Sequence, residues 1–263
     1  MTPLIAIDDV SVAYSNKTIL NDINIEVMAG EFVVVIGQTG CGKSTLLRLV
    51  LGQEQPSRGR ILIEGCAHDH PDRHRGYVPQ KYSLFPDKTV LENITFGPEV
   101  EEFAMFNRFT PRFRRSRREF QSRAFELLRH MGLSESDGAK YPDQLSGGMQ
   151  QRVAIAQALI MQPKILLMDE AFSALDPGTR DEMQMLVRRL WRETGTTILF
   201  VTHNISEAVI LGTRVIMLAN PDGSGSKVVL DSEVYDGLLE RIGGFWQPGR
   251  RATSPSLCVT AAP

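Results

Sequence analysis

Cysteine is scarce in this chain, and its scarcity excludes two classes of small protein. The sequence has 3 cysteines in 263 residues, and their spacing is not paired. Neither a disulfide framework nor a zinc site is therefore predicted. Cys41 lies inside a glycine-rich loop, so a reducing, cytoplasmic setting is the plain interpretation.

Long apolar runs are also missing. The longest uninterrupted ones, Phe32–Ile36 and Val215–Ala219, are far shorter than the roughly 20 residues that a membrane-spanning helix needs. The chain does not start with a basic segment followed by an apolar one, so no signal peptide is expected. If the protein works at a membrane, another chain must span it.

An excess of charge of one sign is lacking as well. Lys and Arg number 29 and Asp and Glu 31, which gives a formal net charge of -2. This balance gives no support for broad nucleic-acid binding. One local exception is the basic cluster, by which we mean Arg108, Arg112, Arg114, Arg115, Arg117 and Arg118. Such a run is usually a solvated face, and a docking surface near anionic headgroups is the open alternative.

The remaining composition, 42% hydrophobic and 23% charged, is that of an ordinary globular protein with an ample core. The alternating apolar residues of 4–36 predict strands, and Phe32–Ile36 suits a central one. A glycine loop follows, and then a helix over Thr45–Leu51 is expected. No internal repeat is visible in the chain.

The middle of the chain changes to helical patterning. Phe120, Ala124, Leu127, Leu128 and Met131 fall on one helical face. From 152 to 218, helices and buried strands are predicted to alternate, with strands over Thr197–Thr202 and Val215–Leu218.

A glycine-rich loop carries the first chemical signal. Its spacing, Gly-x-x-x-x-Gly-Lys-Ser, fits a phosphate-binding loop without deviation. Backbone N–H groups of such a loop turn toward phosphates at the positive end of a helix. Lysine adds a charge there, and the serine hydroxyl is a hard oxygen ligand suited to Mg²⁺. The nucleotide-binding residues predicted here are Gly37, Gln38, Thr39, Gly40, Cys41, Gly42, Lys43, Ser44 and Thr45.

Two further segments follow in order. Ser146, Gly147 and Gly148 precede a helix expected to begin near Met149, which is a second arrangement able to hold an anion. The apolar run Ile165–Met168 ends in Asp169 and Glu170.

Together, in this order, the three segments resemble the ATP-binding-cassette (ABC) ATPases over residues 4–235. The resemblance implies an α/β fold, with a P-loop core of mixed sheet, an antiparallel β subdomain and an inserted α-helical subdomain at about 88–160. Residues 240–263, rich in Gly, Pro, Ser, Thr and Ala, are expected to be a flexible tail.

The resemblance also assigns roles to single residues. ATP and Mg²⁺ are the implied cofactors, with Ser44, Gln80 and Asp169 at the metal. Glu170 would act as catalytic base, aided by Gln80 and His203, the last of which would contact the γ-phosphate. Tyr14 would stack on adenine. Ser173–Asp176 matches a loop that crosses the interface between two cassettes.

The partners that the resemblance implies lie outside this chain. Two cassettes, identical or not, would pair head to tail, each ATP lying between the phosphate loop of one and the Ser146 segment of the other. A multi-span permease would hold the pair peripherally at the cytoplasmic face of the inner membrane, and a solute-binding protein would act indirectly. No nucleic-acid partner is expected.

The residues of the motifs are most similar to those of bacterial importers. Among these importers, the nitrate, sulfonate and taurine group is the most similar. Three positions, Gln157, Ala171 and Asn204, depart from the commonest wording without removing a catalytic group. A cassette for lipid extraction or cell division, and a soluble non-transport cassette, remain alternatives. The transported solute is not predicted, because its pocket would lie in other chains.

Overall fold

The computed structural model describes residues 2–15, 17–67, 70–81, 83–102 and 111–235, together with Leu238 and Ile242. The side chains of residues 102 and 111–114 are outside this description. The tail predicted over 240–263, apart from Ile242, and Arg108 of the basic cluster therefore fall outside the described residues, as do the side chains of Arg112 and Arg114.

The first sheet is antiparallel and comes from the N-terminal quarter of the chain. Its strands lie in the order β2-β1-β4-β5. They are β1 (Ile5–Tyr14), β2 (Lys17–Val27), β4 (Arg58–Ile63) and β5 (Cys66–Ala67). This sheet matches the antiparallel β subdomain that the sequence predicts.

The second sheet is mixed and has the order β10-β9-β3-β8-β7-β6. Its strands are β3 (Phe32–Gly37), β6 (Arg75–Val78), β7 (Ile165–Asp169), β8 (Thr197–Thr202), β9 (Arg214–Ala219) and β10 (Lys227–Glu233). The described ladders are parallel except the one between β9 and β10. Parallel strands place their carboxyl ends at one edge, and this edge receives the predicted site residues.

Strand β3 shows why a continuous apolar run was needed. Phe32, Val34 and Ile36 face one hydrophobic core, and Val33 and Val35 face the other. The first core holds α5 (Pro177–Thr194) and α6 (Ile205–Leu211), and the second holds α1 (Lys43–Leu51) and the antiparallel sheet. Both faces of the strand are therefore covered, as is usual for a parallel sheet.

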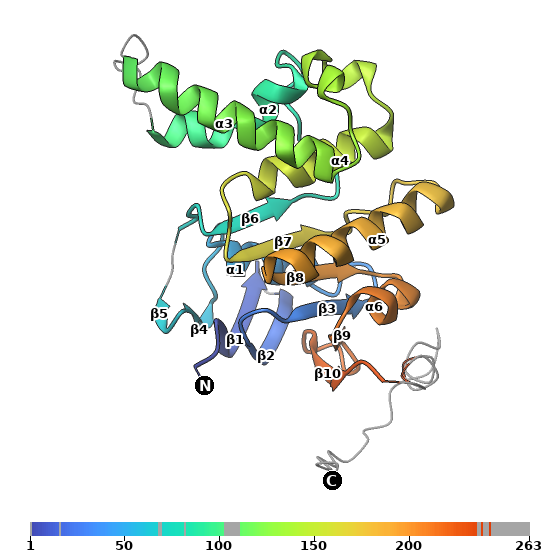
Figure 1. Cartoon of the computed structure of the whole chain (residues 1–263). Helices are drawn as coiled ribbons and strands as arrows, with labels where there is room; N and C mark the ends of the chain where they lie inside the picture. The colour runs from blue at the N-terminus through green and yellow to red at the C-terminus, as the bar shows by residue number, and fades with distance from the viewer. Residues whose placement is uncertain are drawn as a thin grey trace.

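Three helices gather at one end of the molecule, beyond β6 (Figure 1). They are α2 (Val90–Glu102), α3 (Pro111–His130) and α4 (Gly147–Leu159), with two short 3-10 turns at Glu135–Ala139 and Pro142–Gln144 between α3 and α4. Of the predicted helical stripe, Ala124 and Leu128 on α3 and Met131 directly after it are buried. Helix α4 begins two residues before the expected Met149, because Ser146 already caps it.

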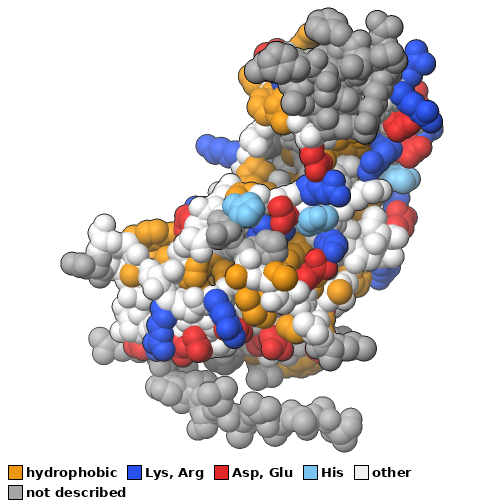
Figure 2. Space-filling model, turned by 90° about the vertical axis from the view of Figure 1, so that its left-hand side faces the viewer, with side chains coloured by type: hydrophobic (Ala, Val, Ile, Leu, Met, Phe, Trp, Pro, Cys, Tyr) orange, Lys and Arg blue, Asp and Glu red, His pale blue; other side chains and the backbone are white. Residues whose placement is uncertain are grey.

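In the described part of the chain, no helix is both long and apolar enough to cross a membrane. The charges on the face seen in Figure 2 are of both signs and interspersed, in line with the small net charge. Two arginines of the basic cluster are paired with carboxylates, Arg115 with Glu119 at 3.4 Å and Arg117 with Glu99 at 3.5 Å.

Candidate active site

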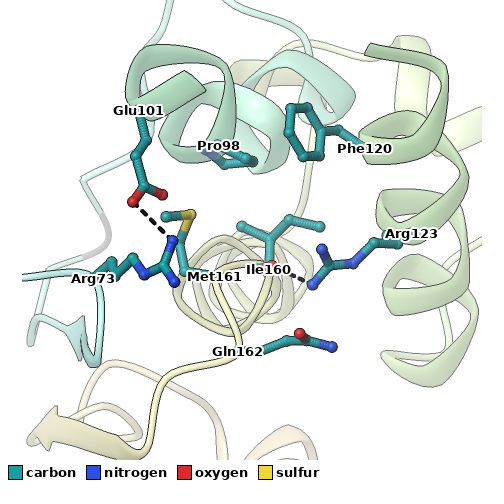
Figure 3. Close-up of a pocket in the computed structure, with 8 residues that line it drawn as sticks. All are labelled: Arg73, Pro98, Glu101, Phe120, Arg123, Ile160, Met161 and Gln162. Carbon is teal, nitrogen blue, oxygen red and sulfur yellow. Dashed lines mark hydrogen bonds and ion pairs between the residues drawn. The ribbon is translucent and has the colours of Figure 1, made fainter. Parts of the chain in front are cut away.

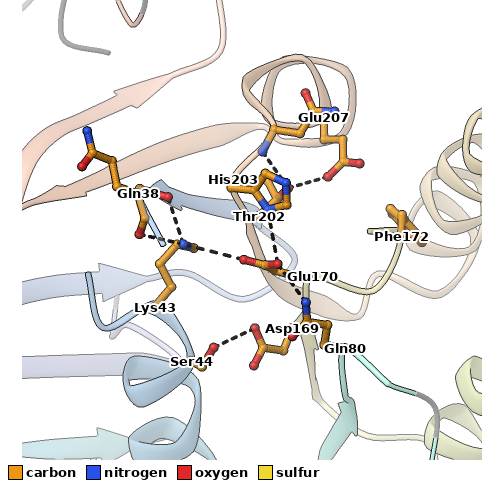
Figure 4. Close-up of polar contacts among 12 residues, drawn as sticks. Gln38, Lys43, Ser44, Gln80, Asp169, Glu170, Phe172, Thr202, His203 and Glu207 are labelled. Carbon is orange, nitrogen blue, oxygen red and sulfur yellow. Dashed lines mark hydrogen bonds and ion pairs between the residues drawn. The ribbon is translucent and has the colours of Figure 1, made fainter. Parts of the chain in front are cut away.

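The carboxyl edge of the mixed sheet brings together residues that lie far apart in the sequence (Figure 4). Strand β3 leads into the phosphate loop, β7 ends at Asp169 and is followed by Glu170, and His203 follows β8 directly. Gln80 comes two residues after β6 ends. The predicted catalytic residues thus meet at the ends of four neighbouring strands.

Glycine is required at two positions of the phosphate loop. A Cβ at Gly37 would lie 2.5 Å from Cys41 Sγ and 2.6 Å from the Leu218 carbonyl oxygen. Gly42 has φ 91°, a conformation that side chains disfavour. The loop therefore closes tightly onto the start of α1, with Gln38, Thr39 and Gly40 exposed.

Cys41 is buried within this loop, at 8% exposure. Burial raises the pKa of its thiol, and the nearby Lys43 opposes that rise. The side chain therefore behaves as a small apolar filler of the loop.

Lys43 is held from both sides although the loop is open to solvent. Its Nζ donates hydrogen bonds to the carbonyl oxygens of Gly37 at 2.9 Å and Gln38 at 3.1 Å. Glu170 Oε1 lies 3.8 Å from the same nitrogen. The ammonium group is thus placed under the loop, where it could meet a phosphate oxygen.

Ser44 and Asp169 place two side-chain oxygen atoms next to each other. Ser44 Oγ donates to Asp169 Oδ1 at 3.0 Å. Burial raises the pKa of Asp169, the hydrogen bond from Ser44 works against this, and the charge of Glu170 adds to the rise. A cation bound between the two oxygens would favour the ionised carboxylate.

Glu170 is the centre of the polar contacts in Figure 4. Besides Lys43, it receives Gln80 Nε2 at 3.2 Å and has His203 Nδ1 at 3.2 Å, both at Oε2. Its φ of 44° is unusual for a residue with a side chain, and its backbone N–H donates to the Val201 carbonyl at 2.9 Å. This arrangement could orient a water molecule for attack and accept its proton.

A buried cluster behind His203 was missed by the sequence reasoning. Thr202 Oγ1 donates to Glu207 Oε2 at 2.5 Å, and the N–H of Asn204 donates to Thr202 Oγ1 at 3.0 Å. Burial raises the pKa of Glu207, although Thr202 and the more distant charge of Arg180 oppose the rise. These hydrogen bonds hold the turn that carries His203. No sequence motif predicts the contact between Thr202 and Glu207.

Tyr14 is held by a second group that the sequence did not reveal. Its hydroxyl donates to Glu54, and Glu54 Oε1 lies 2.7 Å from Arg48 Nε. Arg48 in turn donates to Thr45 Oγ1 at 3.3 Å. Tyr14 is thereby tied to the helix that follows the phosphate loop, and 44% of it remains exposed.

The Ser146 segment, residues 145–150, is a simpler structure. Ser146 caps α4, and its Oγ accepts from the Met149 N–H at 3.3 Å. Among the described residues this is the only hydrogen bond of that hydroxyl. A Cβ at Gly148 would lie 2.5 Å from Thr179 Cγ2, and Thr179 donates its N–H to Asp176 Oδ1 at 3.0 Å. Ser146 and Gly147 themselves are exposed.

The arrangement of these residues fits a nucleoside triphosphate with magnesium. Within the described ranges, no group of three or more His, Cys, Asp and Glu side chains could hold a metal alone. Mg²⁺ is usually held by one or two carboxylates together with substrate phosphates. The Ser44 and Asp169 oxygens, next to a phosphate cradle, are such a set.

Comparison with known proteins agrees with the family that the sequence motifs indicate. A sequence model described as "ABC transporter" matches residues 20–173. The taurine import ATP-binding protein TauB of Rhizobium johnstonii is 44% identical over 204 residues, which cover 78% of this chain and 73% of that protein.

A relative with another solute is nearly as similar. The spermidine/putrescine import ATP-binding protein PotA of Haemophilus influenzae is 38% identical over 236 residues, covering 87% of this chain and 60% of that protein. The chain thus spans less than two thirds of the length of that relative.

A solved structure extends the match to the fold. The dimeric ATP-binding cassette MJ0796, in a post-hydrolysis state with ADP and phosphate, has a TM-score of 0.72 and 32% identity. The match covers 88% of this chain and 99% of that one.

Proposed function

Because this chain belongs to the ABC transporter family and is an ATPase of the ABC type, we propose that it energises import of a small solute through a separate membrane permease. The observation that carries the proposal is the convergence of Lys43, Gln80 and His203 on the Glu170 carboxylate. That convergence is what a hydrolytic site needs, and the import names of its relatives point to uptake.

Within the proposal, residues 37–45 bind the phosphates of ATP. Ser44 and Asp169 hold Mg²⁺, and Gln80 completes its surroundings. The backbone carbonyls of Gly37 and Gln38 keep Lys43 in reach of the phosphates, and Tyr14 offers its ring to adenine. The metal supplies charge neutralisation at the phosphates when bound.

Glu170 then positions and deprotonates the attacking water. Its carboxylate is 16% exposed, so it is accessible from the nucleotide side but shielded from bulk solvent. Gln80 and His203 both contact Oε2, which leaves the position of that oxygen well defined. Hydrolysis of this kind depends chiefly on positioning.

The Ser146 segment serves the ATP of a partner cassette. It is exposed and caps its own helix, whereas the phosphate loop already has its catalytic carboxylates within this chain. Two anion-binding segments with one catalytic constellation favour a head-to-tail pair, with each ATP shared. The dimeric state of the solved cassette supports this arrangement.

Mixing two inactive variants tests the shared site. Ser146→Arg blocks closure on the partner's phosphate, and Lys43→Ala damages the opposite half of the same composite site. A heterodimer of the two has one site with both defects and one with neither. Partial recovery of ATPase activity is expected in the mixture, in proportion to the heterodimers.

A covalently tethered heterodimer with only the Lys43 defect in one half is the control. If it turns over while the mixed heterodimer does not, Ser146 serves ATP within its own chain, and the shared site is wrong. If neither turns over, the comparison is repeated with ATP trapping at the intact site as the readout.

The permease would dock on an apolar patch of the helical end. Phe85 is 36% exposed and Val100 56% exposed. The rings of Phe85 and Phe96 are in contact, with centroids 4.5 Å apart and planes tilted by 51°, and Lys88 lies over both rings. A short amphipathic segment of a membrane protein has the chemistry to cover this patch.

Co-purification tests the docking surface. Val100→Glu should remove the association with the co-expressed permease and leave the ATPase activity of the isolated protein unchanged. Ile210→Glu alters an apolar residue of similar exposure, 46%, on α6, and should leave the association intact. Loss of association in both variants, or in neither, would argue against this placement.

We further propose a nitrate, sulfonate, taurine or related nitrogen or sulfur compound as the solute, and a peripheral location at the cytoplasmic face of the membrane. The similarity to TauB supports the solute class. Solute uptake by cells that lack this chain, with and without its restoration, tests it. Residues 4–235 form the ATPase domain in this proposal, with a helical subdomain at about 88–160, which limited proteolysis can check.

A further inference from the structure

A cavity of about 390 Å³ lies between α2, α3 and the C-terminal end of α4 (Figure 3). Arg73 precedes β6 and Gln162 precedes β7, so the cavity is at the starting edge of these parallel strands. The nucleotide site is at their opposite edge. The volume is in the range of sites that hold small molecules.

The lining is amphipathic. Two helices, α2 and α3, and the segment that follows α4 supply apolar surface through four residues: Pro98, Phe120, Ile160 and Met161. In Figure 3 the ring of Phe120 and the side chain of Pro98 lie along one wall, with Met161 and Ile160 below them. This part of the cavity suits a short aliphatic or aromatic group.

The charged residues of the lining are not equally satisfied. Arg73 Nη1 and Glu101 Oε1 are 3.0 Å apart and neutralise each other. Arg123, which is partly buried, donates from Nη2 to the Ile160 carbonyl at 2.9 Å. Throughout the described ranges, Arg123 forms no ion pair with a carboxylate. The end of α4 offers it only the partial negative charge of a helix C-terminus.

A guanidinium has five N–H donors in a planar fork, and the bond to Ile160 uses one of them. Gln162, the next polar side chain of the lining, has φ 52°. Its amide lies on the same side of the cavity as Arg123 (Figure 3). The cavity therefore joins an apolar wall to a cation with free donors.

We propose that this cavity binds a small organic anion, with its acid group at Arg123 and Gln162 and a short apolar tail against Phe120 and Pro98. A short-chain alkyl sulfonate or carboxylate has this chemistry. Charge-assisted hydrogen bonds to a planar fork hold the acid group. The site is separate from the nucleotide site and does not depend on the proposed transport function.

Titration calorimetry with sodium 1-pentanesulfonate tests the proposal on the full chain. Saturable binding is expected, and sodium sulfate and 1-pentanol, which carry only the charge or only the tail, should bind at least about tenfold more weakly. Equal binding of sulfate and pentanesulfonate would overturn the role of the apolar wall. Affinity that disappears in the presence of a non-hydrolysable ATP analogue would place the ligand in the nucleotide site instead.

Variants locate the ligand. Arg123→Gln should weaken binding of pentanesulfonate at least about tenfold, whereas Arg129→Gln, on the same helix but outside the lining, should not. Met161→Glu adds a competing carboxylate to the cavity and should also weaken binding, whereas Met161→Gln keeps shape without charge and should bind nearly as the parent does.

The two pairs together keep the test decisive. If Arg123→Gln fails to fold, as checked by circular dichroism, the Met161 pair alone decides. Absence of saturable binding to the folded parent, or equal affinity of the two Met161 variants, overturns the site.

Discussion

The phosphate loop and the Ser146 segment are both glycine-containing turns at the start of a helix, yet they differ in their partners. In the first, Lys43 is 5% exposed and has contacts with two carbonyls and Glu170. In the second, Ser146 is exposed and only caps its own helix. The proposed function accounts for this difference: a site assembled within the chain has many internal contacts, whereas a segment that would serve a partner cassette is exposed.

The largest effect is expected at Glu170, where the internal contacts of the first region converge, so a substitution there tests the contrast most directly. Glu170→Gln removes the proposed proton acceptor and keeps the shape of the side chain, so hydrolysis should fall by about 10²–10⁴-fold while ATP binding is retained. Phosphate release and binding of a labelled ATP analogue measure the two quantities. Glu126→Gln, an exposed glutamate on α3, is the matched control. Turnover near that of the parent would mean that another group is the base.

Lys43→Ala tests the phosphate loop through its affinity for ATP. Loss of charge-assisted hydrogen bonds worth about 1.5–3 kcal/mol should weaken ATP binding roughly 10- to 100-fold. Equilibrium binding measures it, with Lys227→Ala, a partly exposed lysine on β10, as control. Unchanged affinity would count against the phosphate-loop assignment.

Ser146→Arg tests the open segment. Its bulk and charge should prevent the ATP-dependent dimer but leave ATP binding by the monomer unchanged, because in the proposed arrangement the segment is not part of the site in its own chain. Size-exclusion chromatography in the Glu170→Gln background measures the dimer, and Ser122→Arg on α3 is the control. If Ser146→Arg lowered the ATP affinity of the monomer as much as Lys43→Ala does, the proposed difference between the two segments would be wrong.

The smallest effect concerns the buried support of the site. Burial raises the pKa of Glu207 above its ordinary value of 4.5, so the folded protein favours the protonated form. Its contribution to stability is present below pH 4.5 and is lost as the pH rises through the folded pKa. Glu207→Gln lacks this loss.

The free energy of unfolding of Glu207→Gln, relative to the parent, should therefore increase from about pH 4.5 toward neutrality. Urea unfolding at several pH values measures it, with Glu126→Gln as control. A flat or decreasing difference would show that the interactions of the ionised carboxylate with Thr202 and Arg180 outweigh its burial.

The parts predictable from sequence are those with a local signature. Strand β8 has the predicted bounds, Thr197–Thr202, because a short apolar run rich in β-branched and aromatic residues is typical of a strand that is covered on both faces. The glycine spacing of the phosphate loop was readable because the backbone itself demands it at Gly37 and Gly42. The family and the fold class were confirmed, and the roles given to single site residues stay predictions.

What the sequence could not provide are the pairings between distant segments. Tyr14 and Glu54 are 40 positions apart, and nothing local to either says that the hydroxyl will find that carboxylate. Strand β3 pairs with β8 and β9, from the other end of the chain. Glu207 could have been read as a surface residue of a short helix, since only the folded packing buries it.

The contact between Gly148 and Thr179 has a consequence for how such sequences can vary. The start of α4 and the first turn of α5 interlock through the threonine methyl group, and the same threonine holds the cap of α5 at Asp176. A methyl group can be present on one side of that contact but not on both. Alanine at 148 should therefore be inherited only together with serine at 179, which keeps the N–H for the cap and gives up the methyl. In a library randomised at both positions and selected for activity, the residues at 148 and 179 should therefore covary.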